Sequence, residues 1–172
     1  MAQAKTLTAA ELRRATDYIA TRPHAARNRA MLLTTHLAGL RVGEVALLSW
    51  SDAVDTSGQV REEIRLNADQ TKGRHPRTVY ISPKLRKELQ AYVNSIPARA
   101  AEAAFFYTQK HPRRGFTPNT LTQLFFNLYR GAGIEGASIR VLMKLMGHRN
   151  ISTTIGYVDA SDEMLRRAVE LA

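Results

Sequence analysis

The chain has 172 residues and no cysteine. Disulfide frameworks, thiolate nucleophiles and zinc sites with cysteine ligands are therefore excluded. No stretch approaches the roughly 18 apolar residues that a membrane-spanning helix needs, and the N-terminus lacks the basic segment and apolar core of a signal peptide. We therefore expect a cytoplasmic, unexported protein with no membrane partner.

Acidic residues are scarce relative to basic ones, since 15 Asp and Glu stand against 25 Lys and Arg, with a formal net charge of +10. Such a balance favours a polyanionic partner, because neutralising phosphates releases counterions. Charge alone leaves nucleic-acid-binding, ribosome-associated and merely basic proteins open. A hydrophobic content of 44% in a chain of this length predicts one compact domain with a real core.

Capping signals and apolar spacing predict a mainly helical chain. Thr8 and Glu11 have capping-box spacing, Ser82 precedes a proline suited to the first helical position, and Gly39 suits a left-handed helix end. Helices are expected over about 9–21, 25–37, 41–48, 83–96, 118–131 and 139–148, with a last one beginning at Ser161.

Two short β-type runs, at 60–66 and 77–81, flank a polar loop that contains Gly73 and Pro76. This order predicts an antiparallel hairpin with a basic tip. The expected fold is of the α+β class, mainly α-helical, with a small antiparallel sheet of three strands.

Three segments carry a resemblance to a known family. They are LAGLRVGEVALLSWSD (37–52), TKGRHPRTVYI (71–81) and GHRNISTTIGYVD (147–159). In this order they resemble the active-site boxes of the tyrosine recombinases of the phage-integrase type, enzymes that exchange DNA strands. The nine-residue step from His148 to Tyr157 also matches. The resemblance covers most of the chain and implies a single integrase-type catalytic domain over residues 1–172.

The resemblance implies four catalytic roles. Tyr157 would attack the scissile phosphate and form a 3′-phosphotyrosine link, a reaction that needs neither metal nor cofactor. Arg41 would bind the non-bridging oxygens, and Lys72 would protonate the leaving 5′ oxygen. His148 would hydrogen-bond the phosphate or shuttle a proton. Alternatives stay open, because Arg41 is also compatible with an ordinary surface or capping arginine and Tyr157 with a packed tyrosine.

Supporting roles fall on the neighbouring charged residues. Glu44 lies three residues after Arg41, so it would orient the guanidinium, or else be a solvated helix carboxylate. Arg74, His75 and Arg77 make the hairpin tip strongly basic and predict contact with DNA. The tip is also compatible with a plain phosphate-contacting loop that takes no part in chemistry.

One part of the family pattern is missing. A His-x-x-Arg box normally lies before the Gly-His box, but here Ser138 runs directly into Ile139, and roughly 15–20 residues are absent by the family spacing. Thr122 and Phe125 occupy the positions that continuous spacing would give the box. Either the molecule has a further segment at this junction, or the chain is a shortened, catalytically impaired homologue. The first is favoured, because deleting a core helix would remove much of a domain's stability.

About seven residues precede the first cap, so we expect no N-terminal core-binding domain in this chain. The leading hypothesis is a site-specific DNA recombinase that acts on double-stranded DNA as a homo-oligomer assembled on its sites. The first alternative is a catalytically inactive, integrase-like DNA-binding protein. The second is a basic RNA- or ribosome-associated protein.

Overall fold

The computed structural model describes residues 7–71, 74–109 and 114–134. The chain divides into two compact units. Unit 1 comprises Met1–Pro23 and Asn119–Ala172, and unit 2 comprises His24–Pro118. The helices predicted over 139–148 and from Ser161 lie outside the described residues.

Unit 1 contains helix α1 (Ala9–Ala20) and nearly all of helix α6 (Pro118–Gly131). The predicted capping box begins α1, because the Thr8 backbone N–H donates to the Glu11 carboxylate and the Glu11 N–H donates to the Thr8 hydroxyl. Gly133 has a φ of +68° and follows the end of α6, where glycine readily adopts the left-handed conformation. Both helices therefore lie where capping and termination signals placed them.

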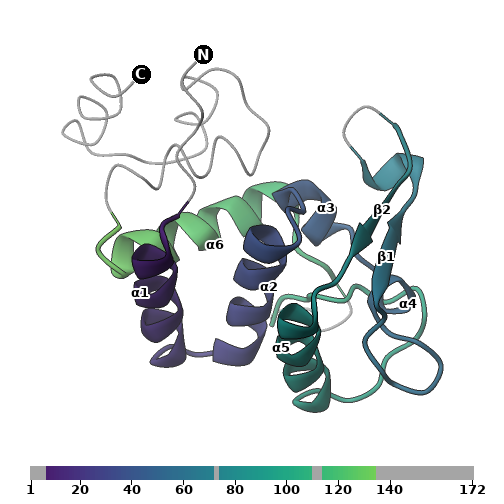
Figure 1. The fold of residues 1–172 in the computed structure, drawn as a ribbon, viewed down its shortest axis with the longest axis horizontal. Coiled ribbons are helices and arrows are strands. Elements are labelled where there is room, and N and C mark those ends of the chain that lie inside the picture. Colours follow the sequence, from purple (N-terminus) through teal and green to yellow (C-terminus); the bar gives the residue numbers. More distant parts are fainter. Residues whose placement is uncertain (1–6, 72–73, 110–113, 135–172) are drawn as a thin grey trace. The chain divides into compact units, whose positions relative to one another are not determined.

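Unit 2 contains four complete α-helices among its described residues. They are α2 (Ala25–Leu37), α3 (Val42–Ala46), α4 (Trp50–Ala53) and α5 (Pro83–Asn94). Helices α2 and α5 pack against each other, and the Arg29 guanidinium makes two hydrogen bonds to the Glu88 carboxylate between them (Figure 1). The sequence did not predict α4, whose single turn is capped by Ser49 and Asp52.

The sheet of unit 2 has two strands among the described residues, β1 (Glu63–Leu66) and β2 (Arg77–Tyr80), which run antiparallel. The predicted three-stranded sheet is therefore wrong. Residues near 104–105 form backbone hydrogen bonds to the chain around Leu48 and Trp50 instead of to either strand. Because those bonds occupy the edge groups of that segment, it adds a single bridge rather than a third strand.

The core of unit 2 is built around aromatic side chains. The Tyr92 ring lies 5.5 Å from the Phe105 ring and 5.3 Å from the Phe106 ring, and its hydroxyl donates to the Phe105 carbonyl at 3.0 Å. Ile64, Leu66 and Val79 form the buried face of the hairpin. One face of the hairpin is thus fixed in the core, and its tip projects from the unit (Figure 1).

Candidate functional site

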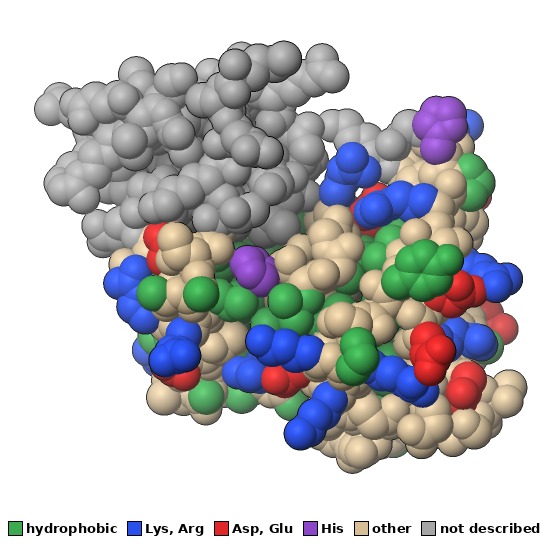
Figure 2. All heavy atoms as spheres, in the orientation of Figure 1, with side chains coloured by type: hydrophobic (Ala, Val, Ile, Leu, Met, Phe, Trp, Pro, Cys, Tyr) green, Lys and Arg blue, Asp and Glu red, His purple; other side chains and the backbone are tan. Residues whose placement is uncertain are grey.

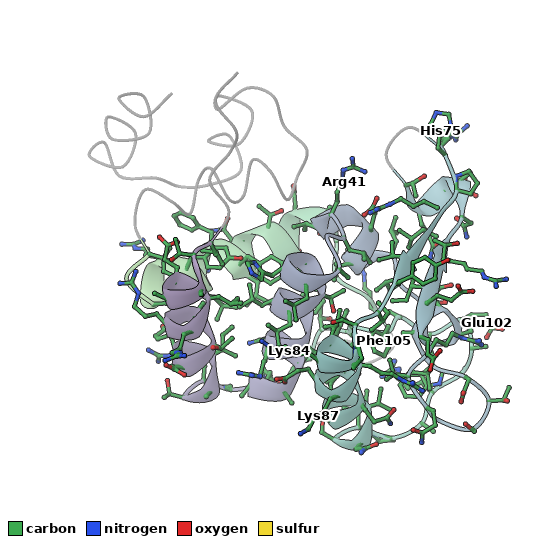
Figure 3. The ribbon with its side chains drawn as sticks, viewed as in Figure 1. Arg41, His75, Lys84, Lys87, Glu102 and Phe105 are labelled. Atoms are coloured by element: carbon green, nitrogen blue, oxygen red, sulfur yellow. The ribbon has the colours of Figure 1, made fainter. Side chains whose placement is uncertain are left out.

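Arg41 stands at the start of α3 with an anchored backbone and a half-exposed side chain. Its neighbours Leu40 and Val42 are both buried, whereas the Arg41 side chain is 45% exposed. The chain turns into this position after Gly39, whose φ of +65° a non-glycine residue rarely adopts. Figure 3 shows the guanidinium pointing outward from α3. Arg41 is therefore held by its backbone, and its half-exposed side chain is accessible to an anion.

Glu44 is a buried carboxylate, with its side chain only 2% exposed. One of its oxygens accepts the backbone N–H of Arg41 at 2.7 Å, and the other accepts from the Arg41 guanidinium at 3.2 Å. The first of these bonds satisfies a free donor of the opening turn of α3. The expected contact between the two side chains is present, and the alternative of a solvated carboxylate is wrong.

Arg77 reaches the same carboxylate from the hairpin. Its guanidinium donates to Glu44 Oε2 at 2.6 Å. Side chains two apart on a strand share a face, so Arg77 lies on the same face of β2 as the buried Val79. Sequence reasoning grouped Arg77 with the basic tip and missed this contact, although the alternation in RTVYI contains the signal.

Arg74 and His75 are exposed at the hairpin tip. Arg74 has a φ of +55°, and its backbone N–H donates to the Thr71 carbonyl at 3.2 Å. The Thr71 hydroxyl in turn donates to the His75 carbonyl at 2.9 Å. Figure 3 shows His75 at the extremity of the hairpin, toward the same side of the view as Arg41. These bonds fix the backbone on which two basic side chains face solvent.

Gln70 ties the loop before the tip to the segment between α3 and α4. Its side-chain amide donates to the Leu47 carbonyl at 3.2 Å and to the Asp52 carboxylate at 2.7 Å. Asn67 caps the short 3₁₀ helix η1 (Ala68–Gln70) that carries Gln70. The loop is thereby attached to the same stretch of chain that follows Arg41.

Three predicted catalytic residues, Lys72, His148 and Tyr157, lie outside the described residues, as does the junction between Ser138 and Ile139. The structure therefore brings together Arg41, Glu44 and Arg77, with the exposed tip residues on the same hairpin. The roles of the other three stay predictions.

The described tyrosines differ sharply in their access to solvent. Tyr92 and Tyr129 are buried, and burial raises the pKa of each phenol well above its usual value. Tyr18 and Tyr107 each lie against an arginine side chain. Tyr80 is 78% exposed. Because a phenol must reach the phosphate and lose its proton to act as a nucleophile, Tyr92 and Tyr129 are unsuited to that role.

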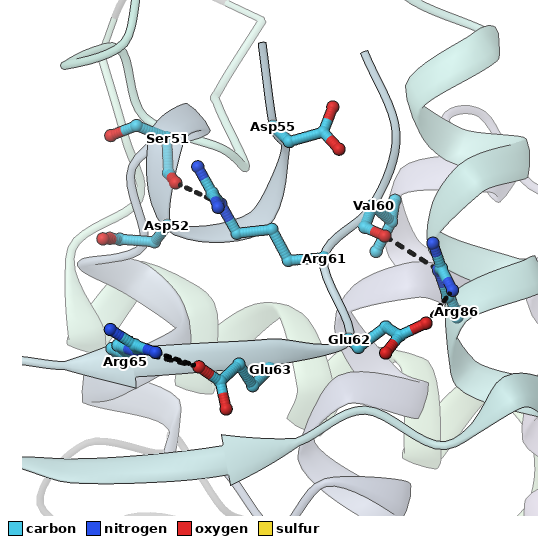
Figure 4. A pocket seen from close by; sticks show the side chains of 9 residues that line it. All are labelled: Ser51, Asp52, Asp55, Val60, Arg61, Glu62, Glu63, Arg65 and Arg86. Carbon is cyan, nitrogen blue, oxygen red and sulfur yellow. Dashed lines mark hydrogen bonds and ion pairs between the residues drawn. The ribbon is translucent and has the colours of Figure 1, made fainter. Parts of the chain in front are cut away.

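An open groove of about 520 Å³ lies elsewhere on unit 2, between the chain before β1 and the start of α5 (Figure 4). Each of its three arginines has a protein acceptor: Arg61 binds the Ser51 carbonyl, Arg65 binds Glu63, and Arg86 binds Glu62. On the face of unit 2 that the space-filling view presents, basic and acidic side chains are likewise interleaved (Figure 2). We therefore do not place the phosphate site in this groove.

Within residues 7–71, 74–109 and 114–134, no cluster of three or more His, Asp or Glu side chains could hold a metal ion. Over the same part of the chain, every helix is too short or too polar to cross a bilayer.

A model of the phage integrase family matches residues 5–136. The chain belongs to the phage integrase family. Its relatives within this family include the tyrosine recombinase XerA of Thermococcus kodakarensis, 30% identical over 98% of this chain and 62% of the relative. Another is the tyrosine recombinase XerC of Rhodospirillum centenum, 27% identical over 85% of this chain and 46% of the relative. This chain thus spans about half to two thirds of the length of these relatives.

Solved structures show the same fold for this integrase-family chain. A crystal structure of XerA recombinase matches with a TM-score of 0.58 and 21% identity, over 97% of this chain and 64% of that one. The Tn1549 transposon integrase in complex with circular intermediate DNA matches with a TM-score of 0.51 and 16% identity, over 100% of this chain and 68% of that one. The predicted tyrosine recombinase fold is confirmed, apart from the number of strands.

The alignment with XerA of Thermococcus kodakarensis extends over 187 residues, which is more than the 172 of this integrase-family chain. That relative therefore has residues for which this chain has no counterpart. The family match itself ends at residue 136, shortly before the Ser138–Ile139 junction.

Proposed function

We propose that this chain is the catalytic part of a site-specific recombinase that cleaves and rejoins DNA strands through a 3′-phosphotyrosine intermediate. Membership of the phage integrase family supports the reaction class. One observation carries the assignment to this chain's own residues: the buried Glu44 binds both the backbone and the guanidinium of Arg41. An arginine fixed in this way presents a charged fork suited to the two non-bridging oxygens of a phosphodiester.

The reaction assigns a distinct task to each predicted residue. The Tyr157 phenol loses its proton to His148 or to water, and its oxygen forms a bond to phosphorus. The bond from phosphorus to the 5′ oxygen breaks, and Lys72 supplies the proton that the leaving oxygen takes up. Arg41 and His148 stabilise the charge that develops on the phosphate. Religation is the reverse reaction with a new 5′ hydroxyl, so the energy of the phosphodiester is retained and no cofactor is required.

Double-stranded DNA is the proposed partner, and Arg74 and His75 are the proposed phosphate contacts of the tip. Their exposure and the fixed backbone beneath them support this assignment. The Tn1549 integrase to which the chain is similar was solved in complex with circular intermediate DNA. Strand exchange joins two sites, so we also propose that several protomers assemble on DNA.

The His-x-x-Arg box is the part of the family's catalytic set that the present sequence lacks. Thr122 and Phe125, which occupy the corresponding sequence positions, are both buried in α6 and present no charge to a phosphate. We propose that the active molecule carries a His-x-x-Arg segment at the Ser138–Ile139 junction. An intact mass above the 19.2 kDa of the present sequence would support this, and a mass equal to it would favour the inactive homologue.

The test uses a nicked duplex from which the freed 5′ end diffuses away after cleavage. The complete protein, with the segment proposed at the Ser138–Ile139 junction, should accumulate a covalent protein–DNA adduct whose attachment maps to Tyr157. Tyr157→Phe should bind the same duplex and form no adduct, because only the nucleophilic oxygen is removed. Arg41→Ala should slow cleavage by on the order of 10²-fold or more, because a charge clamp acts mainly in the transition state.

Tyr80→Phe is the matched control, since Tyr80 is the most exposed tyrosine of the described residues and lies on the hairpin. It should form the adduct as the unsubstituted chain does. Adduct formation by Tyr157→Phe would overturn the assignment of the nucleophile. Binding to DNA with no adduct in any variant would instead support the integrase-like protein without catalytic activity.

A further inference from the structure

The contact between Arg77 and Glu44 joins two segments that are 33 residues apart in the sequence. One is the opening turn of α3, which begins after Arg41, and the other is strand β2, which leads away from the hairpin tip. We propose that Arg77 is a positioning residue, which holds Glu44 in place and thereby sets Arg41 in register with the β1–β2 hairpin. This inference rests on the function proposed above.

The charges explain why Glu44 needs Arg77 as a second partner if Arg41 is to keep positive charge for a phosphate. A buried carboxylate must be paired and hydrogen-bonded to offset the loss of its hydration. With Arg77 in place, two guanidinium groups share one carboxylate and leave a net charge of about +1 for an incoming phosphate. Without Arg77, the full negative charge of Glu44 acts on Arg41 alone, so the clamp loses positive charge that it needs for the phosphate.

The geometry favours this role over direct contact with DNA. Arg77 projects from the same face of β2 as the buried Val79 and lies opposite Leu66, and its side chain, although 39% exposed, is turned toward Glu44. Its guanidinium is 2.6 Å from Glu44 Oε2, the same oxygen that accepts the Arg41 backbone N–H at 2.7 Å. Moving the Arg77 guanidinium away from Glu44 would remove one of the two hydrogen bonds that this oxygen accepts.

The first measurement separates binding from cleavage in the full chain. Arg77→Gln should keep the dependence of DNA affinity on salt unchanged while the single-turnover cleavage rate falls by about tenfold or more. Arg74→Gln, which removes a proposed phosphate contact, should reduce the salt slope by about one unit. Arg77→Lys should recover part of the rate, because an ammonium can make one of the bonds to Glu44.

Arg65→Gln is the matched control for the loss of one positive charge. Arg65 is on the neighbouring strand, pairs with Glu63 and has an 82% exposed side chain. Its substitution should leave the cleavage rate nearly unchanged. If Arg77→Gln instead lowers the salt slope by about one unit and leaves cleavage at saturating DNA intact, Arg77 is a phosphate contact and the positioning role is wrong.

A second measurement needs no catalytic activity. The backbone N–H of Arg41 is bonded to Glu44, so its hydrogen exchange, followed by NMR without DNA, should quicken several-fold in Arg77→Gln and not in Arg65→Gln. An unchanged exchange rate would overturn the positioning role. If exchange is faster in Arg77→Gln but the unsubstituted protein forms no adduct, the proposed function fails while the positioning of Arg41 by Arg77 stands.

Discussion

Two groups of ion pairs in unit 2 use the same residue types in different surroundings. At the start of α3, one buried carboxylate serves Arg41 and Arg77, whereas along the open groove Glu62 and Glu63 each pair with one arginine near solvent. Glu44 is 2% exposed and Glu62 is 81% exposed. Burial therefore decides which ion pairs contribute most to stability, because water competes with the partners of an exposed carboxylate and cannot replace those of a buried one.

The largest effect should come from removing the buried carboxylate. Glu44→Ala removes the capping hydrogen bond at the start of α3 and the contacts with both arginine side chains. It should lower the free energy of unfolding by about 1–3 kcal/mol. The loss stays below that of a fully buried pair, because both arginines are nearly half exposed and can be rehydrated. Urea unfolding of the full chain measures it. A loss below about 0.5 kcal/mol would mean that the Glu44 contacts stabilise the fold no more than exposed ion pairs do, and that burial makes no difference here.

An intermediate effect is expected for Glu88, which is bonded to Arg29 and partly exposed. The Arg29 hydrogen bonds lower the pKa of Glu88 below its ordinary value of 4.5, so the folded state favours the ionised carboxylate. This contribution is present above pH 4.5 and is lost as the pH falls through the lowered pKa of the folded state. Glu88→Gln should cost about 0.5–1 kcal/mol at pH 7, after screening by solvent.

Denaturant unfolding of Glu88→Gln across pH 3 to 7 tests the sign. The stability difference from the unsubstituted chain should shrink as the solution is acidified below about pH 4.5. A difference that grows on acidification would contradict the assigned direction of the pKa shift.

The smallest effect should come from the exposed pairs along the groove. Glu63→Gln leaves Arg65 in water, and the free energy of unfolding should change by less than about 0.5 kcal/mol. The same urea titration used for Glu44 compares the two directly. A loss as large as that of Glu44→Ala would remove the distinction between the two groups.

The sequence predicted most helices because their signals are local. Thr8 with Glu11, Ser82 with Pro83, and Gly133 each lie within a few residues of the helix end that they define. The helical turn α4 was missed because four residues are too few to show periodicity. The number of strands was predicted wrongly, because strand pairing depends on contacts between segments distant in sequence, as in the bridge of residues near 104–105 to the chain around Leu48.

The candidate site was also predictable where its contacts are local in sequence, and not where they join distant segments. The i, i+3 spacing of Arg41 and Glu44 indicated their contact before the fold was known. The burial of Glu44 and its bond to Arg77 depend on how the hairpin packs beside α3, which no local pattern contains. Strand alternation gave the facing direction of Arg77, but only after the strand and its buried face were established.

The shared carboxylate also ties together the evolutionary fates of two distant positions. A chain that loses the arginine at 77 but keeps the acid at 44 carries a buried charge with half its partners, and a chain that loses the acid alone leaves two cations facing each other. A substitution at either position therefore favours a compensating substitution at the other. Among descendants freed from selection for cleavage, joint replacement of residues 44 and 77 by uncharged side chains should outnumber either single loss, and would mark in the sequence where catalysis was abandoned.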